Sequence, residues 1–120
     1  MKMYLNTEQT AKLIELGFEH PKSVSNLTID KELHFKPSFN YSIGELIEML
    51  PKTINHKIWW GNDKGAIGCW GLRIDTECTE YIWTITYERP HSAPIYLEGK
   101  SELIDALYEM VVKLKEEGVL

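Results

Sequence analysis

The sequence predicts an α+β domain: an antiparallel meander sheet of three to five strands with two or three helices packed on one face. Residues 54–87 contain three short strand-like runs in which one face is apolar. Residues 101–117 carry apolar side chains at helical spacing. A sheet face and a helix stripe of this kind bury each other, so residues 1–120 are expected to form a single globular domain.

Three strands are predicted in the meander, at 54–60, 66–75 and 81–87, separated by turn-forming residues. Side chains two residues apart share a face of a strand. Both predicted turns then place one set of mainly apolar residues on a common face. This set is Ile54, His56, Ile58, Trp60, Gly68, Trp70, Leu72, Ile74, Tyr81, Trp83, Ile85 and Tyr87.

The two turns also predict how the strands pair. In the first hairpin Ile58 is expected to face Gly68, and in the second Ile74 is expected to face Tyr81. A slip of one residue would move the apolar set to the opposite face. The common apolar face therefore supports this pairing.

Two helices are predicted from capping boxes, in which a Ser or Asn precedes a Glu or Gln by three residues. They are expected at 6–17, capped by Asn6, and at 42–50, capped by Ser42. Gly17 is predicted to end the first helix, because glycine readily adopts the left-handed conformation found there.

The remaining elements are a hairpin, an edge strand and a third helix. Residues 27–35 predict a short hairpin whose turn starts at Asp30, and Pro37 either ends it or confines it to an edge. Residues 95–98 are expected to form a fourth, edge strand. The third helix is expected to begin after Ser101 as its N-cap and to provide the main contact with the sheet.

Composition and charge disfavour several kinds of partner. The formal net charge is −5 and the isoelectric point is near 5.3, whereas binding to nucleic acid or to an anionic membrane requires clustered Lys and Arg. The sequence shows no secretory signal and no apolar run of the ~20 residues that a membrane span needs. Two cysteines without an export signal predict a cytoplasmic protein.

The residues that usually carry catalysis are dispersed. Cys69 and Cys78 are separated by roughly 20 Å of predicted strand, too far for a shared metal or disulfide. The four histidines lack metal-ligand spacing. The glycines around Gly68 leave room for a ligand, or allow bulges, twist or space for Trp70 and Trp83. We therefore predict no catalytic residue, no metal and no cofactor.

The candidate binding residues lie on the outer face of the predicted sheet and in the 89–94 loop. Trp59, Ile67 and Ile82 point away from the expected core. Either the first helix or the 19–41 segment covers them, or they form a surface for a protein partner or for self-association. The candidate binding residues are Trp59, Ile67, Arg73, Arg89 and His91.

Three stretches, Leu13–Phe18, Tyr41–Lys52 and Leu103–Met110, resemble small uncharacterised proteins carried by phages and integrated elements of Bacteroides-like bacteria. The resemblance covers about half of the chain and implies a cytoplasmic accessory protein of a mobile genetic element. It brings no activity and no catalytic residue.

Three hypotheses about function follow. The first is a non-enzymatic protein-interaction module, one form of which is an acidic inhibitor of a host DNA-binding protein. The second is a small enzyme or ligand-binding protein with a pocket near the 89–94 loop. The third is single-stranded nucleic-acid binding, because aromatic side chains on a sheet can stack with bases.

Overall fold

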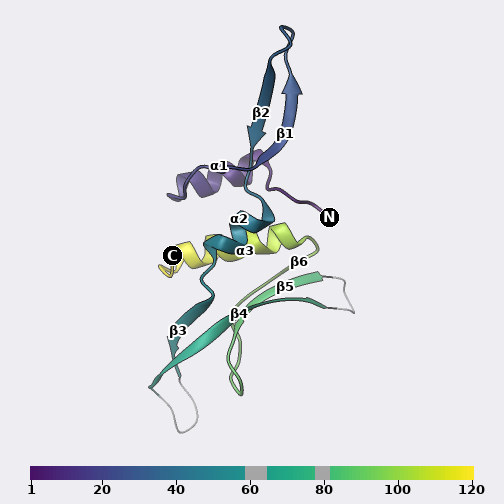
Figure 1. The fold of residues 1–120 in the computed structure, drawn as a ribbon. Coiled ribbons are helices and arrows are strands. Elements are labelled where there is room, and N and C mark those ends of the chain that lie inside the picture. Colours follow the sequence, from purple (N-terminus) through teal and green to yellow (C-terminus); the bar gives the residue numbers. More distant parts are fainter. Residues whose placement is uncertain (59–64, 78–81) are drawn as a thin grey trace.

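The computed structural model describes residues 1–58, 65–77 and 82–120 and confirms the α+β fold (Figure 1). In the described residues an antiparallel two-stranded sheet, β1-β2, is separate from an antiparallel four-stranded sheet of order β3-β4-β5-β6. The elements in chain order are α1 (Thr7–Glu15), β1 (Val24–Ile29), β2 (Phe35–Phe39), α2 (Ile43–Met49), β3 (Thr53–Lys57), β4 (Ile67–Glu77), β5 (Ile82–Glu88), β6 (Ile95–Lys100) and α3 (Leu103–Glu116).

The pairing predicted for the larger sheet is wrong in both hairpins. Ile74 pairs with Ile85 rather than Tyr81, a shift of four positions. His56 rather than Ile58 pairs with Gly68, a shift of two positions. Because both shifts are even, every side chain keeps its predicted face. An apolar pattern of period two cannot distinguish such registers.

Among the described residues, the large apolar side chains of the predicted face are buried or, at Leu72, Ile74 and Trp83, partly buried. Ile54, Ile58, Trp70, Ile85 and Tyr87 are all at most 7% exposed. Trp60 and Tyr81, which were predicted to join them, lie outside the described residues. The sheet therefore has one face toward the core, as its alternation predicts.

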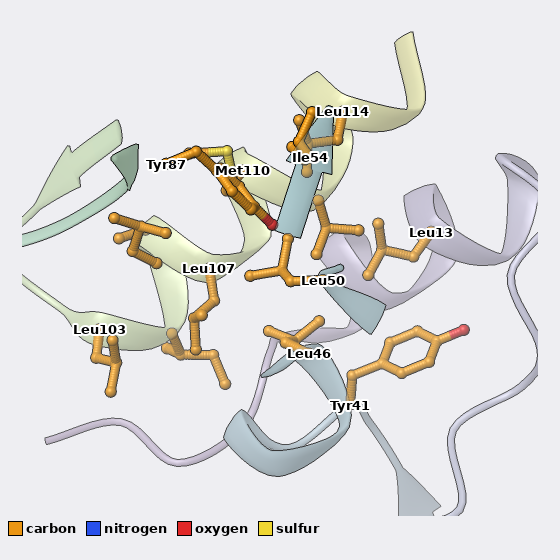
Figure 2. Packing of buried hydrophobic residues seen from close by; sticks show 14 of the residues in the cluster. Leu13, Tyr41, Leu46, Leu50, Ile54, Tyr87, Leu103, Leu107, Met110 and Leu114 are labelled. Carbon is orange, nitrogen blue, oxygen red and sulfur yellow. The ribbon is translucent and has the colours of Figure 1, made fainter. Parts of the chain in front are cut away.

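Helix α3 covers this face and confirms the predicted main contact. It packs against β5 and β6 and also against α2. Its buried stripe consists of Leu103, Ile104, Ala106, Leu107, Met110, Val111 and Leu114. Figure 2 shows Leu13 of α1 and Leu46 of α2 in the same cluster. All three helices thus contribute to one core.

Both predicted capping boxes are present. The Gln9 N–H donates to Asn6 Oδ1 at 2.8 Å, while the Gln9 side chain accepts from the Asn6 N–H at 3.1 Å. Ser42 and Glu45 make the equivalent exchange at the start of α2. Gly17 has φ +100° and follows the last turn of α1, so its predicted role as the helix end is also confirmed.

The predicted cap of the third helix is wrong. Glu102 rather than Ser101 is the N-cap, and its side chain makes no capping hydrogen bond. Strand β6 continues to Lys100, beyond the predicted 95–98 segment, because Lys100 pairs with Trp83. The backbone therefore turns into the helix one residue later, and the Glu102 carboxylate instead accepts from the N–H of Lys2 at 3.1 Å.

The Tyr87 hydroxyl gives a test of this core. It donates to the Pro51 carbonyl at 2.7 Å, and burial raises the pKa of Tyr87 from 10.0 to about 12. Because the folded pKa is raised, the associated stability is complete below pH 10 and is lost as pH rises toward 12. Tyr87→Phe is expected to cost about 1 kcal/mol at neutral pH and to reduce the alkaline loss of stability.

Urea unfolding of both proteins at neutral pH and between pH 10 and 12 measures these two effects. The pKa values of Tyr41 and Tyr108 are also raised by burial, so the variant should keep part of the alkaline sensitivity. An alkaline profile identical to that of the wild type would contradict the assigned role of Tyr87.

Candidate functional site: an apolar hairpin arm

Strands β1 and β2 form a hairpin arm, residues 24–39, that projects from the helices on the side away from the larger sheet (Figure 1). The predicted hairpin is confirmed, but its second strand begins at Phe35 and not Leu33, because Leu33 has φ +62° and lies in the turn. Pro37 does not end the strand. It lies within β2, which is an edge strand as predicted.

One face of the arm is entirely apolar and the other is polar. Strand pairing places the apolar residues opposite one another as Val24–Phe39, Leu27–Pro37 and Ile29–Phe35. The alternate pairs, Asn26–Ser38 and Thr28–Lys36, point to the other face. The arm is therefore an amphipathic two-stranded ribbon.

The apolar face of the arm is exposed to solvent in the described part of the chain. Its Val, Leu, Ile and Phe side chains are between 47% and 66% exposed. In the described part of the chain, no helix or other strand packs extensively against β1 or β2. The radius of gyration is 17.5 Å, compared with roughly 14 Å for a compact domain of this length. The arm thus extends apolar surface into solvent, where a two-stranded hairpin alone has marginal stability.

The turn at the tip is held by Asp30. Its Oδ1 accepts from the N–H groups of Glu32 and His34, both at 2.9 Å. Its Oδ2 lies 3.6 Å from Lys36 Nζ. Asp30 stabilises this turn by mimicking a backbone acceptor, and Leu33 is left 79% exposed at the tip.

The base of the arm is joined to the helical body by polar contacts. The Asn40 side chain donates to Ser25 Oγ at 2.8 Å, and the Tyr41 hydroxyl donates to the Glu19 carbonyl. The Glu45 carboxylate accepts from the Lys22 N–H at 3.0 Å. Burial acts to raise the pKa of Glu45, but hydrogen bonds to its carboxylate outweigh burial and lower the pKa. The base is thereby fixed to α2.

The residues predicted as a binding surface lie elsewhere, on the larger sheet. Ile67 is 63% exposed on β4, so neither α1 nor the 19–41 segment covers it. Arg73 shares this strand face but is about 20 Å away and pairs with Asp75 and Glu88, each at 3.2 Å. Trp59 lies outside the described residues.

Two predicted residues are brought together near the 89–94 loop. Arg73 and Arg89 line an open depression of about 450 Å³, which is also lined by Gly71, Leu72, Glu88 and Pro90. The Arg89 guanidinium lies 5.8 Å from the Trp70 ring centroid. His91 is exposed, has φ +60° and does not line this depression. A cleft combining Arg89, His91 and a carboxylate is thus not formed.

No protein-family model, curated protein or solved structure matches the chain. Within residues 1–58, 65–77 and 82–120, no group of three or more His, Cys, Asp or Glu side chains could hold a metal ion. None of the described helices is long and apolar enough to cross a membrane. Cys69 is free and exposed, and Cys78 lies outside the described residues. Function must therefore be inferred from the chain's own surfaces.

The sequence-based prediction did not include the surface on the arm, although the sequence carries a signal for it. A period-two alternation was available in β2, where Phe35, Pro37 and Phe39 alternate with Lys36 and Ser38. Such alternation predicts one apolar face. It cannot reveal whether that face is covered.

Proposed function

We propose that this protein is a non-enzymatic protein-interaction module whose arm provides the contact surface. The observation that carries the proposal is the uncovered apolar face of the arm, with Phe35 66% and Ile29 58% exposed. Contiguous exposed apolar surface of several hundred Å² marks interaction sites in soluble proteins, and aromatic side chains are enriched at interface cores.

The charge distribution favours a protein over a nucleic acid as the partner. The arm has two basic residues, Lys31 and Lys36, which equal in number the acidic Asp30 and Glu32. Binding to phosphates needs an excess of Lys and Arg, which the arm lacks. In the larger sheet, the aromatic rings of Trp70 and Tyr87 are buried and do not offer a stacking platform.

The cellular role that we propose is that of a cytoplasmic accessory protein of a mobile genetic element. This part of the proposal rests on the resemblance of the 13–18, 41–52 and 103–110 stretches. The Arg73–Arg89 depression is a second candidate contact on the larger sheet, and the exposed Ile67 lies about 20 Å from it along β4.

The proposal is tested by affinity capture with a face variant and a matched control. Leu27→Thr/Phe35→Thr removes apolar surface from both strands, and threonine is favourable in strands. Thr28→Ser/Ser38→Ala changes the opposite face of the same two strands. Each tagged protein is incubated with lysate of the cells that carry the gene, with and without nuclease treatment, and bound proteins are identified by mass spectrometry.

We expect the wild type and the control to capture the same partner, either another protein or untagged copies of this chain. The face variant is expected to lose this partner. Identical capture by all three proteins would show that the apolar face is not the contact surface. Capture that disappears only after nuclease treatment would support nucleic-acid binding instead.

A further inference from the structure

We propose that the apolar face of the arm binds the same face of a second copy of this chain, forming a two-fold symmetric dimer. This inference rests on the proposed function, because it names the partner for the arm. A two-fold interface brings one surface against itself, and a ribbon with one apolar face can be self-complementary in this way. The arm projects away from the helices on the side opposite the larger sheet (Figure 1).

The area of this face matches what a dimer needs. It presents six apolar residues, Val24, Leu27, Ile29, Phe35, Pro37 and Phe39. At roughly 100 Å² of exposed surface for each residue, the face provides about 600 Å² per chain. Burial of both copies removes about 1,200 Å² from water, which is the lower limit for a specific, stable interface. Area alone does not set the affinity, so the oligomeric state is measured over a range of concentrations.

At the Leu27–Pro37 pair, the edges of the arm are poorly suited to strand addition. Asp30 donates its N–H to the His34 carbonyl, and hydrogen-bonded and non-hydrogen-bonded pairs alternate in an antiparallel ladder. Leu27 and Pro37 therefore form a non-hydrogen-bonded pair whose backbone groups point to the outer edges. Pro37 has no N–H to offer there, and the Leu27 N–H donates to Asn26 Oδ1 at 2.9 Å.

Edge pairing would also leave the apolar face in water, because it extends the ribbon without covering it. Face-to-face packing covers the apolar side chains of both copies and keeps the polar face, with Asn26, Thr28 and Lys36, in solvent. Two sheets packed in this way form a small sandwich with a dry interior.

Charge does not oppose contact between two arms. The chain has a formal net charge of −5. Within residues 24–39, Lys31 and Lys36 balance Asp30 and Glu32, so the whole net charge lies outside the arm. The six residues of β1 span about 20 Å, and charges separated by more than about 8 Å are largely screened at physiological salt. The acidic bodies can therefore remain apart while the arms meet.

The oligomeric state of the full chain tests this inference. Sedimentation equilibrium is measured over a range of micromolar concentrations for the wild type, Leu27→Thr/Phe35→Thr and Thr28→Ser/Ser38→Ala. The wild type and the polar-face control are expected to approach twice the chain mass of 13.9 kDa. The face variant is expected to dissociate at least about 100-fold more readily, because it removes two central apolar contacts from each copy.

A second variant and a structural measurement distinguish loss of the interface from local unfolding of the arm. Phe35→Lys places an unpaired charge in the apolar part of the proposed interface in both copies and should also give a monomer. Nuclear Overhauser effects between Asn26 and Ser38, which pair across the arm, report whether each variant keeps its strands. A monomeric variant that keeps these effects has lost the interface and not the fold.

The outcomes separate this inference from the proposed function. A wild type that stays monomeric, or a face variant that still dimerises, would overturn the second copy as partner. If a monomeric wild type captures a different protein through the same face, the interaction function stands without the dimer. If all variants are monomeric and capture is identical, both proposals fail. If the monomeric wild type binds phosphatidylcholine vesicles and the face variant does not, the partner of the apolar face is a lipid surface. That result would overturn both proposals.

Discussion

Replacing Trp70 by alanine is expected to lower the free energy of unfolding by about 3–5 kcal/mol. Trp70 is 0% exposed on the core face of β4 and is one of the largest side chains in the core. Its indole N–H donates to the Ala93 carbonyl at 3.4 Å, and its ring makes an edge contact with His56 at 5.6 Å between centroids. Truncation would remove these contacts and leave a cavity. Since domains of this kind are stable by roughly 5–15 kcal/mol in total, the loss is severe.

Urea unfolding followed by circular dichroism measures this effect, and Ile67→Ala is the matched control. Ile67 lies three residues earlier on the same strand but is 63% exposed, so its truncation should change stability by less than about 0.5 kcal/mol. The 89–94 loop should also become more mobile in Trp70→Ala, because Trp70 contacts both Ala93 and Arg89. A loss of under about 1 kcal/mol would contradict the burial of Trp70.

Replacing Gly68 by alanine is expected to destabilise the protein by about 1–3 kcal/mol through overpacking. A Cβ atom at position 68 would lie 2.9 Å from both Ile58 Cδ1 and Trp70 Cζ3. Both of these side chains are buried, so neither can move aside freely. The space beside Gly68 is therefore occupied by core side chains, which confirms the predicted space for Trp70.

Gly71→Ala provides the control for the loss of glycine itself. Gly71 lies on the same strand, and a Cβ atom there would come no closer than 4.0 Å to a neighbouring heavy atom, the Glu88 carbonyl oxygen. Its replacement should be neutral or slightly stabilising, because alanine has less conformational freedom in the unfolded chain. Equal losses at positions 68 and 71, measured by urea unfolding, would show that overpacking is not the cause.

The local elements of this fold could be predicted because their causes are local. A capping box needs two side chains three residues apart, and those at Asn6 and Ser42 formed as predicted. The cap at Ser101 failed because a distant pairing between Lys100 and Trp83 extended the preceding strand. A local pattern predicts an element reliably only where no long-range contact competes with it.

The binding residues were harder to predict because exposure is a property of the whole molecule. Ile67 was correctly placed on the outer face, and Arg73 and Arg89 meet at one depression. Arg89 and His91 are close in the sequence, and the sequence does not indicate that the turn places His91 outside this depression. The exposed face of the arm was likewise invisible, since apolar side chains in strands are usually covered.

Which side chains share a face could be predicted from the sequence alone. Alternation with period two fixed the core face of the sheet through Ile54, Trp70 and Ile85, and helical spacing fixed the stripe of α3. Strand register, and whether another element packs over each apolar face, depend on the tertiary structure. Even shifts of register leave every face unchanged, and cover depends on where distant elements pack. For this reason the larger sheet is covered by α3, whereas the arm keeps an apolar face in solvent.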